Sequence, residues 1–179
     1  KVLFSPVAHA RIKHIDTSAA EALPGVRAVV CYKNAPDIPF NCCGENIDET
    51  KNERIFDPIV RYVGDKVAAV AADTMAIAEK AVKLIEVEYE PLPFYVDPEE
   101  AMKEDAYPIH EGGNIAEVVN LNQGDVDKGM EEADLVFEDR YSLPAIHHSA
   151  IETHAALAQY DANGKLTVWS PTQDAFAVR

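Results

Sequence analysis

Hydrophobic and polar positions in the first part of the chain alternate between strand-like and helix-like patterns. Short alternating or apolar runs predict strands over residues 2–4, 10–15 and 26–32. A short helix is predicted over residues 18–23, because residues 16–18 offer capping side chains and Pro24-Gly25 would end it. Residues 34–58 show little periodicity and predict a long loop.

The clearest helical pattern covers residues 75–85, with Thr74 as its cap. Its apolar side chains share one stripe at helical spacing: Ile77, Ala78, Ala81, Val82 and Ile85. Before this helix, the apolar runs 60–63 and 67–72 flank Gly64-Asp65, which predicts a β-hairpin.

Residues 86–89 alternate as a further strand, which Pro91 ends. Strands and helices that follow one another in this order predict an α+β fold in which helices cover a sheet. The pattern then changes, so we place a domain boundary there and predict domains 1–94 and 95–179. In the second domain, helices are predicted over 97–102, 125–133 and from 174, and strands over 135–143, 155–160 and 166–169.

The composition excludes some functions. The 179 residues include 31 acidic and 16 basic side chains, a net charge of −15, and no basic stripe, so we expect no nucleic-acid partner. No apolar run approaches the ~20 residues of a membrane span. Three cysteines are an odd number and do not form a disulfide framework, so we expect a reduced, cytoplasmic location. Because Lys1 leads directly into a strand, we expect the chain to be a fragment of a longer protein.

The densest set of ligand-type side chains consists of His147, His148, Glu152 and His154. In a strand, residues four apart are ~13 Å from each other, too far to share one zinc ion with bonds near ~2 Å. In a helix, His148 and Glu152 are neighbours, but His154 points away from that pair. We therefore assign no metal ligands in this chain. The stretch also resembles the cupin pattern in part, although the spacing of its histidines differs, and a small cupin-like metal enzyme is one alternative.

Other catalytic patterns are missing. The sequence has no glycine-rich dinucleotide or phosphate loop and no nucleophile elbow. Acid pairs such as Glu99-Glu100 suit the solvated faces of short helices. On motifs alone, the chain contains no complete active site.

Three ordered sets of stretches cover nearly the whole chain. They are Ser5–Ile12, Ile15–Ala20 and Leu23–Val26; then Val60–Val70 and Val87–Pro93; then Gly124–Asp127, Glu152–Ala158 and Leu166–Gln173. Together they resemble the large, molybdenum-binding subunit of the xanthine dehydrogenase and aldehyde oxidase family. The resemblance implies an α/β hammerhead domain over 1–94, followed by the truncated start of the molybdenum-cofactor-binding domain over 95–179.

The resemblance also implies a chemistry. Members of this family hydroxylate aldehydes or nitrogen heterocycles with oxygen from water, using a molybdopterin-type molybdenum cofactor. Electrons leave through Fe-S clusters, usually to FAD, on partner domains or subunits. The glutamine of the family's Ser-Thr-Gln motif, which hydrogen-bonds an oxo ligand of molybdenum, matches Gln173 in Ser170-Pro171-Thr172-Gln173. Pro171 departs from the family's Ser or Thr. Gln173 is thus the one cofactor-binding residue implied.

The rest of the family's machinery is missing from these residues: the glycine-rich cofactor segment, the substrate-orienting arginine and the carboxylate base. We therefore expect the isolated chain to be inactive and to carry no cofactor. Its expected partners are the remainder of the large subunit and the Fe-S and flavin components, and homodimer formation stays open. The main alternative is a non-catalytic scaffold or binding module with the hammerhead fold. The resemblance implies a class of reaction and no single substrate.

Overall fold

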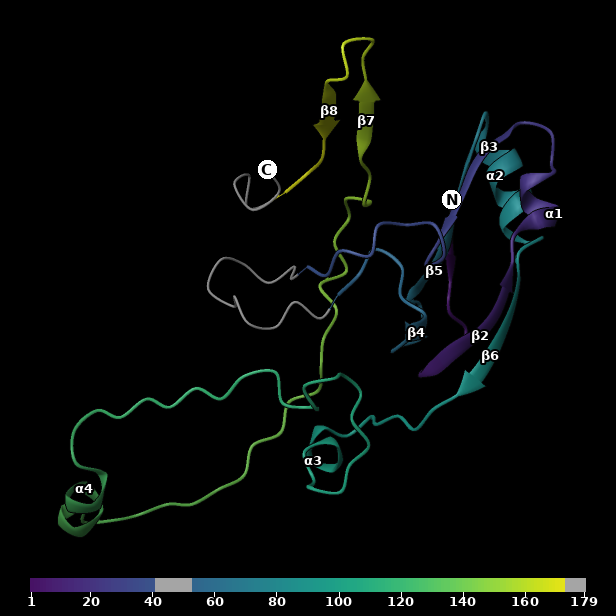
Figure 1. Cartoon of the computed structure of the whole chain (residues 1–179). Coiled ribbons are helices and arrows are strands. Elements are labelled where there is room, and N and C mark those ends of the chain that lie inside the picture. The colour runs from purple at the N-terminus through teal and green to yellow at the C-terminus, as the bar shows by residue number, and fades with distance from the viewer. Residues whose placement is uncertain (41–52, 173–179) are drawn as a thin grey trace. The chain divides into compact units, whose positions relative to one another are not determined.

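The computed structural model describes residues 1–40 and 53–172 (Figure 1). The chain divides into two compact units, Lys1–Val118 and Val119–Arg179. The first unit contains two three-stranded sheets and two helices that share one hydrophobic core. Cys42 and Cys43, two of the three cysteines, lie outside the described residues.

One sheet has the strand order β1-β5-β3. Its strands are β1 (Val2–Phe4), β5 (Lys66–Ala72) and β3 (Val26–Cys31), and both pairings are antiparallel. The central strand β5 buries Val67, Ala68 and Val70, whereas Ala71 is exposed. The strands predicted from 2–4 and 26–32 are confirmed.

The other sheet has the order β4-β2-β6, formed by β4 (Ile59–Val60), β2 (Ala10–Asp16) and β6 (Glu86–Pro91). Both neighbours of β2 are antiparallel to it. Along β2, Ile12 and Ile15 are buried, whereas Arg11 and Lys13 are exposed and pair with Glu90 and Glu88 of β6. The alternation in the sequence therefore reports a sheet with one buried face.

The predicted hairpin over 60–63 and 67–72 is wrong, because β4 and β5 belong to different sheets. The residues between them form a turn around Asp65, whose carboxylate accepts hydrogen bonds from the amides of Arg61 at 3.0 Å and Lys66 at 2.8 Å. Backbone bonds to Ser5 also hold this turn. A glycine-containing turn between apolar runs indicates a change of direction, but it does not determine which strands pair.

Two helices, α1 (Ser18–Glu21) and α2 (Met75–Val82), contact the β1-β5-β3 sheet and each other (Figure 1). Both are shorter than predicted. The Thr74 hydroxyl caps α2 by accepting the Ile77 amide at 3.3 Å. Ala78 and Ala81 on the predicted stripe are buried, and their small side chains allow the helix to approach the sheet closely.

After β6 the first unit continues through α3 (Pro98–Ala101), which Asp97 caps. The second unit contains α4 (Val126–Glu132), capped by Asp125, and a hairpin of β7 (Leu157–Tyr160) and β8 (Leu166–Trp169). The predicted strand over 135–143 is wrong: these residues are described and form no strand. Alternation alone does not make a strand where no partner ladder forms. The helix predicted from 174 lies outside the described residues.

The described part of the second unit buries very little. Apart from Asp161 and Thr167, its residues are exposed, including the apolar side chains of β7 and β8. A two-stranded hairpin without a packed face is marginal in water. Among the described residues, no helix has the length and apolarity needed to cross a membrane.

Candidate functional site

The predicted cofactor contact, Gln173, lies outside the described residues. The two residues before it, Pro171 and Thr172, are described, and they line an open cavity of about 380 Å³ in the second unit. The remaining lining residues come from the segment before β7: Ala150, Glu152, Thr153 and His154. Two segments that the family resemblance singled out therefore line one cavity.

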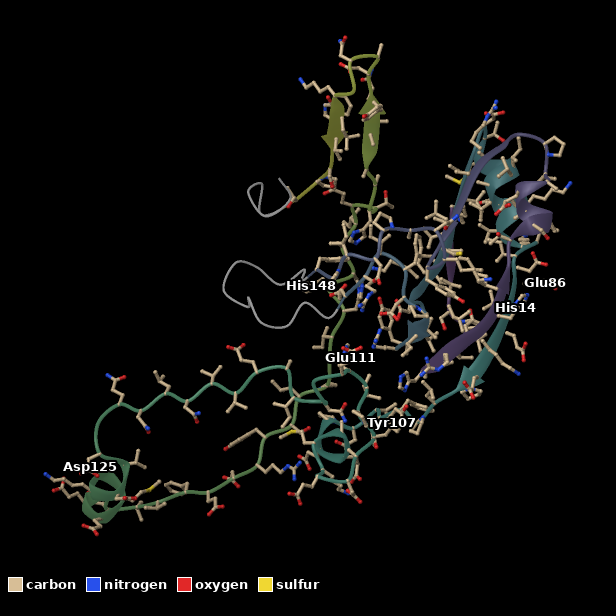
Figure 2. All side chains as sticks on the ribbon, viewed as in Figure 1. His14, Glu86, Tyr107, Glu111, Asp125 and His148 are labelled. Atoms are coloured by element: carbon tan, nitrogen blue, oxygen red, sulfur yellow. The ribbon has the colours of Figure 1, made fainter. Side chains whose placement is uncertain are left out.

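The four ligand-type residues of this region do not converge on a metal. No group of three His, Cys, Asp or Glu side chains in the described ranges could hold a metal ion. His147 instead accepts the Ser149 amide on its Nδ1 at 3.0 Å, and His148 lies on the extended segment before β7 (Figure 2). Glu152 and His154 line the cavity as polar groups.

A second polar cavity, of about 250 Å³, lies within the first unit. Its lining residues are mostly charged: Glu53, Arg54, Asp57, Arg61, Tyr62, Asp65, Lys66 and His110. The Arg61 side chain makes three hydrogen bonds here. Its Nη1 donates to Asp57 Oδ2 at 3.0 Å and to the Ile59 carbonyl at 3.2 Å, and its Nε donates to the Ile109 carbonyl at 3.2 Å.

The charges around this cavity balance, since Glu53, Asp57 and Asp65 oppose three cations. Burial lowers the pKa of His110, and the nearby Arg61 charge lowers it further, while the Asp57 carboxylate opposes both effects. A balanced, internally bonded set of charges favours a structural role over the binding of a free ion.

Sequence reasoning missed the buried residues that organise this region. His9 is buried, and its Nδ1 donates to the Pro93 carbonyl, since a carbonyl oxygen can only accept. Its ring meets that of Tyr107 edge-to-face, with centroids 6.0 Å apart. The only available signal was that His9 and Arg61 fall inside stretches that resemble the family; nothing in their local pattern indicated burial.

Comparison with known proteins identifies two domains. Residues 1–93 match the domain described as aldehyde oxidase and xanthine dehydrogenase, a/b hammerhead domain. Residues 109–179 match the molybdopterin cofactor-binding domain. These matches confirm the predicted hammerhead followed by a partial cofactor-binding domain, and they overturn the cupin alternative. The domain boundary at 94/95 stays a prediction.

Individual relatives agree with these two domain matches. The chain is 36% identical over 185 residues to the xanthine dehydrogenase molybdenum-binding subunit of Escherichia coli O157:H7, covering 100% of this chain and 25% of that protein. It is 40% identical over 179 residues to a probable xanthine dehydrogenase subunit of Bacillus subtilis, covering 100% and 24%. Quinoline 2-oxidoreductase from Pseudomonas putida 86 shares its fold with a TM-score of 0.79, at 30% identity over 97% of this chain and 23% of that one.

The chain thus spans about a quarter of the length of the curated relatives just described. Both of its matched domains are domains of molybdenum-dependent oxidoreductases, and they occur in the order that the sequence predicted. The chain belongs to the molybdenum-binding subunit family of the xanthine dehydrogenases and aldehyde oxidases.

Proposed function

We propose that this chain supplies the hammerhead and the first part of the cofactor-binding domain of a molybdenum hydroxylase. The enzyme would oxidise an aldehyde or a nitrogen heterocycle with oxygen from water. The named relatives act on different heterocycles, a xanthine and a quinoline, so membership of the family does not select the substrate.

The observation that carries the proposal is the unpaired apolar surface of the second unit. Its exposed apolar side chains include Leu143, Ile146, Ile151, Leu157, Tyr160 and Trp169. Apolar groups at this density normally meet other protein, because leaving them in water costs about 25 cal/mol per Å². The remaining part of a cofactor-binding domain would provide that cover. The isolated chain is accordingly proposed to be inactive.

The described residues suit the cofactor only in part. The cavity beside Pro171 offers the hydroxyls of Thr153 and Thr172 and the ring of His154, which can donate or accept hydrogen bonds. Glu152 adds a negative charge, which disfavours an anionic group at the same place. The cavity is open, so these residues could contact one edge of a pterin but could not enclose it.

Gln173 is proposed to hydrogen-bond an oxo ligand of molybdenum in the intact enzyme. When bound, the cofactor would supply the two-electron oxidation. An amide suits the place beside it, because it can donate a hydrogen bond without adding charge or competing for the metal. Its place in the sequence, directly after the cavity-lining residues Pro171 and Thr172, supports this proposal.

The test is the change Gln173→Ala in the intact subunit that contains this chain, assembled with its partners. Loss of a group that positions a metal ligand lowers activity by about 10- to 100-fold. We expect hydroxylation to fall by that amount while molybdenum content stays unchanged. Thr167→Ala, on β8, is the matched control. Unchanged activity in Gln173→Ala would contradict the assigned role.

The proposed partners are the remainder of the large subunit and the Fe-S and flavin subunits or domains. We also propose a cytoplasmic location, supported by the free, buried thiol of Cys31, which a reducing compartment would preserve. Cell fractionation of the intact complex tests the location. The scaffold alternative predicts instead that the subunit containing this chain assembles without molybdenum.

A further inference from the structure

Residues 94–108 lie between the two matched domains, where a flexible linker would be expected. Their contacts differ from those of a free linker. The whole stretch belongs to the first compact unit, which extends to Val118. We call residues 93–114 the strap.

One side chain closes the strap on itself. The Oδ1 atom of Asn114 accepts the Ile109 amide at 2.7 Å, and its Nδ2 donates to the carbonyls of Ala101 at 2.9 Å and Tyr107 at 3.0 Å. Both donor hydrogens of the amide are thereby used. Tyr95 adds a fourth bond, since its hydroxyl accepts the Tyr107 amide at 2.7 Å.

Two residues of the hammerhead anchor the strap from outside. His9, just before β2, donates to the Pro93 carbonyl and contacts the Tyr107 ring. Arg61, just after β4, donates to the Ile109 carbonyl. These anchors are separated from their strap partners by 84 and 48 residues along the chain, so both are tertiary contacts.

The anchors are themselves held in place. Arg61 is pinned by Asp57 and the Ile59 carbonyl, and its side chain is only 16% exposed. The backbone carbonyl of His9 accepts the Leu92 amide at 3.0 Å, directly before the strap begins. A charged donor fixed by other bonds loses little conformational entropy when it binds a carbonyl.

We propose that the strap is a docked element that sets the point from which the cofactor-binding domain departs from the hammerhead. His9 and Arg61 are its positioning residues. By holding residues 93–110 against the hammerhead, they remove much of the freedom that an unstructured connector of this length would have. This inference stands on the first unit alone and does not depend on the proposed function.

The test measures hydrogen exchange of the 179-residue chain. The double variant His9→Phe with Arg61→Met keeps a ring and an aliphatic stem but removes both donors to the strap. Loss of a neutral and a charge-assisted hydrogen bond should speed exchange of the Tyr107 and Ile109 amides by at least about tenfold. Exchange of the β5 amides should change by less than about twofold, because β5 pairs with β1 and β3 and not with the strap.

Arg27→Met is the matched control. It removes an arginine that makes two bonds to Asp73 on the same domain, at 2.6 and 2.9 Å, without touching the strap. It should leave Tyr107 and Ile109 exchange unchanged. Wild-type exchange at these amides in the double variant would overturn the proposal.

A variant confined to the strap covers the case in which the double variant unfolds. Asn114→Ala removes the internal closure and leaves every hammerhead side chain intact. It should speed exchange at Ile109, whose amide loses its acceptor, while β5 stays protected. If Ile109 exchange is unaffected, the strap is not closed by Asn114 and the proposal fails.

Discussion

Val60 and Val67 are the largest fully buried side chains in the described residues, and they lie on either side of the Asp65 turn. Val60 ends β4 in one sheet and Val67 lies on β5 in the other. Between them, Val63 is 66% exposed. The same substitution at the three positions therefore tests whether both sheets enclose one core.

Replacing a fully buried valine with alanine removes two carbon atoms from the core. At about 0.8 kcal/mol for each buried methylene, the transfer loss is about 1.6 kcal/mol. A remaining cavity raises the total, because the surrounding core relaxes only in part. We expect Val60→Ala and Val67→Ala each to lower the free energy of unfolding by about 2–3 kcal/mol. Val63→Ala should cost less than about 0.5 kcal/mol.

Urea denaturation followed by far-UV circular dichroism measures these differences. Trp169 is unsuitable as a fluorescence reporter, because it belongs to the second unit and is exposed. If Val63→Ala destabilises the chain as much as Val60→Ala, or if Val60→Ala has no effect, Val60 of β4 and Val67 of β5 do not share one core.

Two further predictions follow from single side chains. Burial is the main cause that lowers the pKa of His110, so the docked strap favours the neutral imidazole. Docking should therefore hold above the ordinary histidine pKa of 6.5. It should weaken as pH falls from 6.5 to the lowered pKa. Hydrogen exchange at Ile109 between pH 7 and 5 measures this, and His110→Gln should flatten the profile; a profile that His110→Gln leaves unchanged would assign the effect to another group. Thr74→Ala removes the cap of α2 and should cost about 1 kcal/mol in urea denaturation, whereas Thr74→Ser, which keeps the hydroxyl, should cost less; equal losses would refute the capping role.

Local patterns predicted the elements that depend on interactions between residues close in sequence. The stripe at Ala78 and Ala81, the cap at Thr74, and the alternation around Ile12 all report burial or bonding within a few residues. Local patterns do not predict which strands pair when the strands are far apart in sequence. β4 joins β2 across about fifty residues, and nothing in residues 60–72 distinguishes that arrangement from a hairpin.

The anchors of the strap illustrate the same limit at the level of side chains. His9 and Arg61 act on carbonyls far away in sequence, so their roles depend on tertiary contacts that no spacing rule encodes. Residues 135–143 show the converse, since a strand-like pattern remained without a partner. Gln173 was reached only through resemblance to a family, and its role stays a prediction.

Molybdenum content tests the central claim most directly. The 179-residue chain and the intact subunit that contains it would be purified from a host that makes the pterin cofactor, and the metal measured by inductively coupled plasma mass spectrometry. We predict stoichiometric molybdenum in the intact subunit and none on the chain alone. An intact subunit without molybdenum, or a chain that retains the metal by itself, would contradict the assignment of this chain as the front part of a molybdenum hydroxylase.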